Sequence, residues 1–292
     1  MAHEQRKMQN KTHPDEETSE KKWKRSERLA ALALQLSRQP NHLVTLTELA
    51  AQYGCAKSTL SEDIRELRDT LYEQGLGWIE TVPGAGGGAC YRPWQPMHYH
   101  HALARRCCEQ LSEPERIMPG GFLYTLDITS DTSLLRPLGV LLAQPFAQGR
   151  PDAVLTIEAK GVPVGLMAAE ALGVPLVIAQ KENRPTEGSV VTLNYQTSAG
   201  GTLRSMSLPR RALQGGKRVL IVDDFVKGGG TVSALCDMMD EFSCEVLGVA
   251  ALIAAPGVRA ANGMPIRAPL ILNRVDRAAR CVDLQVAAWL AE

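Results

Sequence analysis

The sequence has no net charge, no long apolar run and no paired cysteine motif, and each absence narrows what the chain can be. Its 292 residues carry 32 Lys and Arg against 32 Asp and Glu. Any affinity for nucleic acid must therefore come from the local arrangement of charge. No apolar run approaches the roughly 18–20 residues that span a bilayer, and the polar N-terminus lacks the apolar segment of a signal peptide.

Cysteine usage points to the compartment. The seven cysteines are scattered, odd in number and never spaced as Cys-x-x-Cys, which fits a disulfide framework poorly. The sequence therefore predicts a protein of the reducing cytoplasm, without a membrane anchor.

The remaining composition is that of a globular protein, with 45% hydrophobic and 22% charged residues. The length allows two domains. Residues 1–22 are polar and mixed in charge, and we predict a disordered tail there. Residues 23–93 and residues 94–292 differ in their patterns, and we expect them to form separate domains.

Residues 23–93 show three short helical patterns followed by a hairpin. Thr45 and Glu48 are spaced as a capping box at the start of the second helix. The third helix is expected from about Lys57 to Glu73. Strands at 78–82 and 89–92 flank the glycine-rich tip 83–88. The order helix, turn, helix and hairpin is typical of a winged helix-turn-helix, whose third helix would enter the major groove.

Hydrogen-bond donors gather near the start of this third helix. The candidate DNA-binding residues there are Lys57, Ser58, Thr59, Ser61 and Arg65. Upstream, Lys24, Arg25 and Arg28 could contact phosphates, which supply affinity and orientation but not sequence choice. The glycines of the hairpin tip would let it approach a nucleic-acid backbone closely.

A protein-binding helical domain is the alternative for this half. The third helix also carries acids that weaken a purely electrostatic argument, namely Glu62, Asp63, Glu66 and Asp69. DNA binding requires that these acids face away from the DNA.

The pattern changes from about residue 115, where apolar runs alternate with helices. The runs are 153–157, 176–178, 190–195, 219–222 and 246–253. Several are continuously hydrophobic, as in strands that are covered on both faces. This half is predicted to be α/β with a mainly parallel sheet.

The strongest motif is an apolar strand, two acids, a glycine-rich turn and a threonine, followed by a helix from Val232 to Phe242. The motif residues are Asp223, Asp224, Phe225, Val226, Lys227, Gly228, Gly229, Gly230 and Thr231. Backbone N–H groups at such a helix start can hold a phosphate. Two carboxylates beside a phosphate would repel it unless they bind a sugar diol instead. The alternative is an ordinary strand-to-helix turn with acids present by chance.

This stretch resembles the signature by which type I phosphoribosyltransferases bind 5-phosphoribosyl-1-pyrophosphate (PRPP). It lacks the Gly-Lys-Ser/Thr terminus of a Walker A loop. The resemblance implies that Ala159, Lys160 and Gly161 hold the pyrophosphate in a loop that often has unusual peptide geometry. Lys181 is a weaker candidate, and residues 197–204 stand where the family has a mobile loop. For each lysine alone, a solvated surface position is the alternative.

The two halves together resemble the purine operon repressors of Gram-positive bacteria over roughly residues 23–255. The supporting stretches are 26–29, 56–63, 81–88, 119–122, 186–189, 206–208 and the Asp-Asp-Phe loop. The resemblance implies a type I phosphoribosyltransferase-like parallel-sheet domain preceded by a winged helix. It further implies a homodimeric transcriptional regulator that binds operator DNA and is released by PRPP, with Mg²⁺ as a candidate companion of PRPP.

Catalysis is not expected, because Lys227 and Gly228 stand where enzymes usually carry threonine or serine. An active purine or orotate phosphoribosyltransferase remains the alternative. Phe122 and Phe225 are near the ligand in the family's arrangement and could stack on a purine, so a guanine nucleotide is a candidate competitor. Core packing is the alternative role for both rings.

Two further patterns are given no functional role. His98, His100 and His101 lie close in sequence, but no carboxylate or cysteine accompanies them at ligand spacing, so no metal site is expected. Cys107 and Cys108 are neighbours, and adjacent cysteines rarely reach relaxed disulfide geometry.

Overall fold

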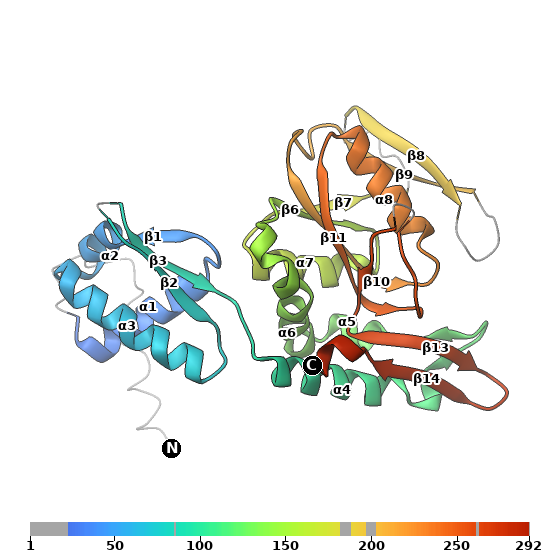
Figure 1. Ribbon diagram of the computed structural model, residues 1–292, viewed down its shortest axis with the longest axis horizontal. Coiled ribbons are helices and arrows are strands. Elements are labelled where there is room, and N and C mark those ends of the chain that lie inside the picture. The colour runs from blue at the N-terminus through green and yellow to red at the C-terminus, as the bar shows by residue number, and fades with distance from the viewer. Residues whose placement is uncertain (1–22, 85, 182–187, 197–202, 261–262, 292) are drawn as a thin grey trace, which may run out of the picture.

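The computed structural model describes residues 23–84, 86–181, 188–196, 203–260 and 263–291, and the predicted tail 1–22 lies outside them. Figure 1 shows two lobes, an N-terminal one at the left and a larger C-terminal one at the right. Residues 93–96, which have no regular structure, join the lobes.

The N-terminal lobe is a winged helix. Its elements are α1 (Arg25–Ser37), β1 (Leu43–Thr45), α2 (Leu46–Tyr53), α3 (Lys57–Glu73), β2 (Trp78–Val82) and β3 (Gly88–Arg92). The strands form an antiparallel sheet in the order β1-β3-β2. The predicted capping box is confirmed, because the Glu48 amide donates to the Thr45 hydroxyl and the Thr45 amide donates to the Glu48 carboxylate. Leu60 and Ile64 of α3, four positions apart and so on one face of the helix, are fully buried against α1 and α2.

The C-terminal lobe is α/β. Its first part comprises α4 (Met97–Leu111), a 3-10 turn (Pro114–Arg116), β4 (Ile117–Met118), β5 (Phe122–Leu123), α5 (Leu126–Ser130), α6 (Thr132–Ala143) and a second 3-10 turn (Gln144–Gly149). There follow β6 (Ala153–Ile157), α7 (Gly161–Leu172), β7 (Leu176–Ala179), β8 (Val190–Gln196), β9 (Leu203–Pro209), β10 (Arg218–Val226) and α8 (Gly230–Glu241). The chain ends with β11 (Glu245–Ala254), β12 (Ile266–Arg267), β13 (Leu270–Asp276), β14 (Cys281–Val286) and a 3-10 turn (Ala288–Leu290).

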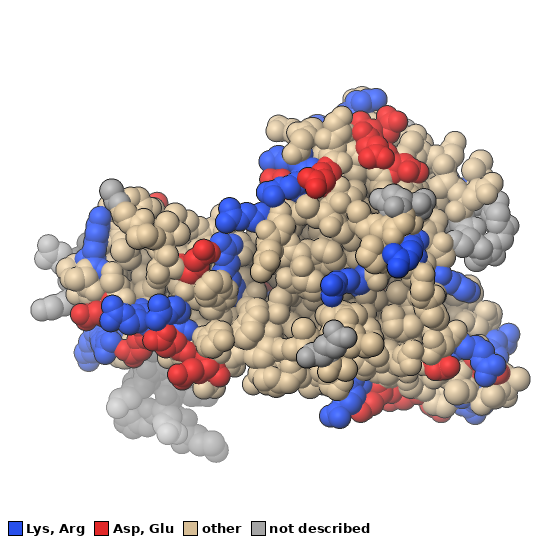
Figure 2. Space-filling model, viewed as in Figure 1, with Lys and Arg blue, Asp and Glu red and all other residues tan. Residues whose placement is uncertain are grey.

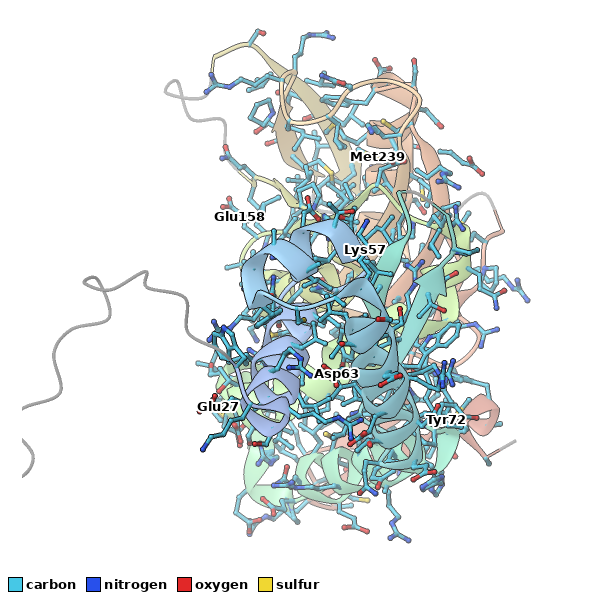
Figure 3. The ribbon with its side chains drawn as sticks, turned by 90° about the vertical axis from the view of Figure 1, so that its left-hand side faces the viewer. Glu27, Lys57, Asp63, Tyr72, Glu158 and Met239 are labelled. Carbon is cyan, nitrogen blue, oxygen red and sulfur yellow. The ribbon has the colours of Figure 1, made fainter. Side chains whose placement is uncertain are left out.

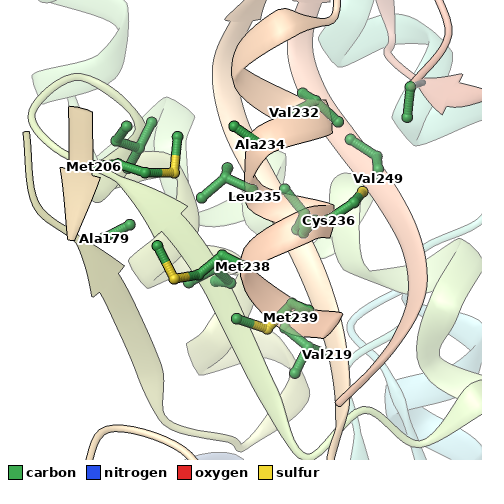
Figure 4. Packing of buried hydrophobic residues seen from close by; sticks show 14 of the residues in the cluster. Ala179, Met206, Val219, Val232, Ala234, Leu235, Cys236, Met238, Met239 and Val249 are labelled. Carbon is green, nitrogen blue, oxygen red and sulfur yellow. The ribbon is translucent and has the colours of Figure 1, made fainter. Parts of the chain in front are cut away.

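The main sheet has the order β14-β13-β11-β10-β6-β7, and β12 adds to β11. All its pairings are parallel except β13 with β14. Every residue of β6 is buried, as expected of a strand covered on both faces. Helices α6 and α7 belong to the apolar core on one face. Helix α8 fills the other face with residues such as Leu235 and Met238 (Figure 4).

One predicted strand takes another place. The run 190–195 lies in β8, which pairs with β9 as a separate antiparallel hairpin and not in the parallel sheet. Its burial is one-sided, because Val191 and Tyr195 are buried while alternate residues are half-buried or exposed. The hairpin joins the core on the α8 side, and an isolated bridge between Gln180 and Ser207 connects it to the end of β7.

The structure bears on whether the chain holds a metal ion, a disulfide or a membrane-spanning helix. Within the described ranges, no group of three His, Cys, Asp or Glu residues is arranged to hold a metal ion. His100 is buried and its Nε2 lies 3.1 Å from Gln144 Oε1, and the seven cysteines are free thiols. No helix in the described part of the chain has the length and apolarity to cross a membrane.

Candidate effector site and nucleic-acid interface

Three parallel strands bring the predicted effector residues to one edge of the sheet. Strands β6, β10 and β7 run parallel, so their carboxyl ends meet there, where α/β proteins commonly bind ligands. Residues 158–161 follow β6, Lys181 follows β7, and Asp223 and Asp224 lie near the end of β10.

The glycine-rich turn after β10 leads directly into a helix. Residues 227–229 form the turn and Gly230 begins α8, two residues earlier than predicted. Gly229 has φ +77°, and an added Cβ would lie 2.5 Å from the Arg259 carbonyl oxygen. Only glycine fits this position without a shift of the backbone. Lys227 and Gly228 are exposed, while Thr231 is half-buried in the first turn of α8.

The two acids differ in environment. Asp223 is 6% exposed, whereas Asp224 is half-buried. The Asp224 amide donates to Asp223 Oδ1 at 2.9 Å. Burial raises the pKa of Asp223 well above its usual range, the charge of Asp224 raises this pKa further, and Lys181 acts in the opposite direction. The opposing effect of Lys181 places its charge close enough to act on Asp223.

The loop after β6 touches the acid loop. A Cβ on Gly161 would lie 2.4 Å from Thr156 Oγ1 and 2.7 Å from Asp223 Oδ1, so the first residue of α7 packs directly against the buried acid. The peptide bond between Glu158 and Ala159 is cis, and Ala159 and Lys160 are exposed at the start of α7. The structure thus brings together the residues predicted to hold the pyrophosphate and those predicted to hold the ribose.

Two residues of this edge, Glu158 and Thr156, were not predicted as part of the site. The Lys181 amide donates to Glu158 Oε1 at 2.7 Å, which links the ends of β6 and β7. The Thr156 hydroxyl oxygen is fully buried and has no hydrogen-bond partner in the described residues. A hydroxyl-bearing residue in an otherwise apolar strand was the available signal for Thr156.

The two candidate aromatic residues lie on different elements. Phe122, on the β4-β5 hairpin, is 72% exposed, and an added Cβ on Gly120 would contact its ring. Phe225, on β10, is half-buried and packs against the core on the α6–α7 face. Of the segment 197–204, residues 197–202 lie outside the described residues, and 203–204 begin β9.

The start of α3 presents most of the predicted DNA-binding side chains to solvent. Lys57, Ser58, Ser61 and Arg65 are exposed, and Thr59 is half-buried. The Lys57 ammonium donates to the Thr47 hydroxyl at 2.8 Å, which connects α3 with α2. Figure 3 shows this lobe facing the viewer, with Lys57 near one end of α3. Figure 2 shows basic and acidic side chains side by side on the lobe, so no single charge dominates this view.

The basic residues before and in α1 do not share one role. Lys24 is exposed. Arg28 was predicted to contact phosphate, and this is wrong, because its side chain is 8% exposed and its guanidinium pairs with Asp63. Arg25 is 58% exposed, but it bonds to Asp63 at 3.2 Å and to Glu66.

The acids of α3 are therefore mostly engaged within the domain. Asp63 is buried beneath Arg28 and Arg25, Glu66 pairs with Arg25, and Asp69 pairs with Arg68. Glu62 remains exposed at the surface. Three of the four acids that weakened the electrostatic argument thus have an arginine partner.

The glycines of the wing serve two different purposes. An added Cβ would lie 2.1 Å from the Val44 carbonyl oxygen at Gly88 and 2.3 Å from the Val82 carbonyl oxygen at Gly87. These two glycines are needed for contacts within the domain. At Gly84 and Gly86 an added Cβ would meet nothing within 4 Å, so only these leave open space at the tip for another molecule.

A winged helix joined to a phosphoribosyltransferase-type domain defines a class of DNA-binding proteins with a built-in small-molecule site. Residues 24–93 match the family described as bacterial purine repressor, N-terminal, and residues 132–268 match the phosphoribosyl transferase domain. The purine biosynthesis transcriptional repressor PurR of Bacillus subtilis is 37% identical over 90% of this chain and 93% of its own length. The chain belongs to this PurR family.

Two other relatives frame the functional question. The purine biosynthesis transcriptional activator PurR of Lactococcus lactis strain IL1403 is 36% identical over 90% of this chain and 97% of its own length. A xanthine phosphoribosyltransferase of Deinococcus deserti is 30% identical over 55% of this chain and 88% of its own length. The two relatives that match over 90% of this chain are thus transcriptional regulators of opposite sign, whereas the enzyme matches over 55% of it.

Proposed function

We propose that this protein regulates transcription of purine biosynthesis genes and that PRPP weakens its binding to operator DNA. The observation that carries the proposal is the contact between Gly161 and Asp223. It joins a loop suited to pyrophosphate with an acid pair suited to a ribose diol, in the same chain as a winged helix. Repression is the sign we favour, with activation as the alternative because a relative is an activator.

In this proposal each part of PRPP meets one element. Asp223 and Asp224 accept hydrogen bonds from the ribose hydroxyls. The backbone amides of 227–231 surround the 5′-phosphate at the start of α8. Residues 159–161 and Lys181 face the pyrophosphate, and Mg²⁺ could accompany it.

Release from DNA follows from linkage. A ligand shifts an equilibrium only by its differential affinity for the two states. PRPP must therefore bind the free protein more tightly than the operator complex. A coupling of about 1–3 kcal/mol would change operator affinity by roughly 5–150-fold.

On the DNA side, we propose that Lys24, Lys57, Arg65 and the hydroxyls of 58, 59 and 61 meet the operator. Arg25 keeps enough exposure to join them, although it also bridges α1 and α3. A homodimer would present two such helices to a two-part operator.

We further propose that the domain binds PRPP without turnover. Support comes from Lys227 and Gly228, which remove a hydroxyl from the phosphate cradle and add a charge beside it. An assay of base-dependent pyrophosphate release with xanthine, guanine, hypoxanthine and adenine tests this. Sustained release of pyrophosphate with any base would mean that the protein is an active phosphoribosyltransferase that also binds DNA.

A guanine nucleotide is proposed as a competitor for the same site. The ring of Phe122 supports this, because the residue is largely exposed and aromatic rings stack on one another. Calorimetric titration of a guanine nucleotide with and without saturating PRPP tests the proposal. Equal affinity in the two titrations would mean separate sites.

The decisive experiment is an operator titration at one fixed salt concentration with and without PRPP, since DNA affinities depend steeply on salt. The unmodified chain should bind the operator less tightly when PRPP is present. Asp224→Ala should bind the operator normally and lose the response. Asp240→Ala, which removes an exposed acid in the last turn of α8, is the matched control and should respond fully. An unmodified chain that binds no PRPP would overturn the proposal.

A further inference from the structure

Helix α7 extends from the effector site to the winged helix. Its first residue, Gly161, packs against Asp223, and the residue after its end, Gly173, lies against Pro40 in the turn between α1 and β1. Its 12 residues correspond to a length of about 18 Å at 1.5 Å per residue. One helix thus contacts both places that a PRPP-responsive DNA-binding protein must connect.

The effector end and the sides of α7 are tightly packed. Gly161 leaves no room for a Cβ between Thr156 and Asp223, and an added Cβ on Gly165 would lie 3.2 Å from Thr156 Cβ. On the other side, a Cβ on Gly139 of α6 would lie 2.5 Å from the backbone of Met167. Because close-packed elements transmit strain with little compression, a shift at Gly161 should move α7 as a unit.

The far end of α7 is held by one side chain of the winged helix. Asn41 Nδ2 donates to the Ala171 carbonyl at 2.9 Å. Carbonyls in the last turn of a helix have no partner within the helix, so Asn41 completes the end of α7. Asn41 Oδ1 accepts from Arg92 Nη1 at 2.9 Å, and the backbone N–H of Asn41 donates to the Tyr91 carbonyl, so Asn41 is also fixed to β3.

The surroundings of this contact leave room for movement. Beside it lies an open groove of about 440 Å³ between the lobes, lined in part by Arg38, His42, Glu170 and Val174. The Asn41 bond and the Gly173–Pro40 approach are therefore narrow points of contact next to empty space. A small displacement of α7 would change them first.

We infer that Asn41 and Gly173 form the coupling contact through which the effector site acts on the winged helix, with α7 as the connecting rod. This inference rests on the proposed function. Ligand binding at Asp223 and residues 159–161 shifts the start of α7, and the shift at Ala171 and Gly173 changes the position of the α1–β1 turn and of β3. Neither residue contacts the ligand or the DNA in this scheme.

Two variants test the contact in different ways. Asn41→Asp keeps an oxygen that accepts from Arg92 and tolerates the residue's φ of +63°, but it cannot donate to Ala171. Gly173→Ala leaves all charges unchanged and places a methyl group 2.0 Å from the Pro40 carbonyl oxygen. Its matched control is Gly216→Ala, where φ is +78° and an added Cβ meets nothing within 4 Å. Both alanines bear the left-handed strain, and only one meets the other lobe.

The full-length proteins are compared by calorimetry with PRPP alone and by operator titration with and without PRPP. We expect each variant to bind PRPP and to bind the operator, each measured alone, as the unmodified chain does. The PRPP-induced weakening of operator binding should fall about fivefold or more in Asn41→Asp, the change that one hydrogen bond of ordinary net strength produces. It should also fall in Gly173→Ala, because the added methyl group forces Pro40 away from the end of α7. Gly216→Ala should keep the full response.

The outcomes separate this inference from the proposed function. If the unmodified chain responds to PRPP and both variants respond equally well, the coupling contact is refuted while the proposed function stands. If both variants bind each ligand but lose the response, the contact is supported. If the unmodified chain binds no PRPP, the proposed function fails, and this inference fails with it. Should Asn41→Asp lose operator binding through its added charge, Gly173→Ala decides.

Discussion

Breaking the ion pair between Arg28 and Asp63 should destabilise the winged helix strongly, because it leaves a buried charge without its partner. The pair joins α1 to α3, and its side chains are 8% and 1% exposed. The hydrogen bond to Asp63 raises the pKa of Arg28, which is the direction expected of a guanidinium held by a carboxylate. We consider the change Arg28→Met, which keeps most of the apolar stem and removes the charge.

The magnitude follows from what the change leaves behind. Removing one partner of a buried pair typically costs about 3–5 kcal/mol, because the other charge stays buried without compensation. Arg25, at 3.2 Å from Asp63, would still offer partial compensation. We therefore expect a loss near the lower limit, about 3 kcal/mol. That is a large part of the roughly 5–15 kcal/mol that stabilises a typical protein.

The assay is urea unfolding followed by tryptophan fluorescence, with Arg68→Met as the control on the same lobe. Arg68 pairs with Asp69 through side chains that are 42% and 54% exposed, and such surface pairs contribute about 0–1 kcal/mol. The double variant Arg28→Met, Asp63→Leu should recover much of the loss, because no lone charge remains. Equal destabilisation by Arg28→Met and Arg68→Met would refute the reasoning.

Three further expectations concern the other residues described. Lys57→Ala should weaken operator binding and reduce the slope of log affinity against log salt concentration by about 0.9 if its ammonium meets one phosphate. Calorimetry should show an unchanged PRPP affinity. An unchanged slope would mean that Lys57 does not contact the DNA. Because the pKa of Asp223 is raised by folding, the folded chain keeps a proton that the unfolded chain releases near pH 3.8. The stability of the protein without ligand should therefore fall as pH rises from there through the folded pKa. Asp223→Asn should lessen this decline in urea unfolding curves measured at several pH values. Gly88→Ala should destabilise the winged helix by about 1–3 kcal/mol through overpacking against the Val44 carbonyl oxygen. The methyl group of Gly84→Ala would meet no neighbour, so this variant should lose only the stability that its φ of +111° costs an alanine. Thermal unfolding compares the two variants.

The secondary structure of the winged helix and of the acid motif was largely predictable because its determinants are local. The capping box of Thr45 and Glu48 and the inward spacing of Leu60 and Ile64 act within one or two turns of helix. The strand and turn of the acid motif are equally local. The hairpin β8-β9 was not assigned to its own sheet, because an apolar run does not reveal which strand it pairs with.

The partners of charged and small residues were harder to predict, since they depend on contacts far apart in sequence. Arg28 and Asp63 are separated by 35 positions. In the sequence alone, Arg28 resembles a residue that contacts phosphate, and Asp63 resembles an acid that would disfavour DNA binding. Folding turns both into one internal contact that removes an acidic charge from the helix surface. The same holds for Gly88, because its missing side chain leaves room for the Val44 carbonyl oxygen of β1 and not for an external ligand.

The effector edge shows how a long-range contact gives meaning to a local motif. The acid loop and the loop after β6 are each recognisable alone, but neither indicates that Gly161 fits between Thr156 and Asp223. That fit places the N-terminus of α7 in contact with a carboxyl group whose pKa is raised by burial. A ligand that binds the acid pair therefore changes the surroundings of a helix start, and the opposite end of that helix meets Asn41 of the DNA-binding lobe.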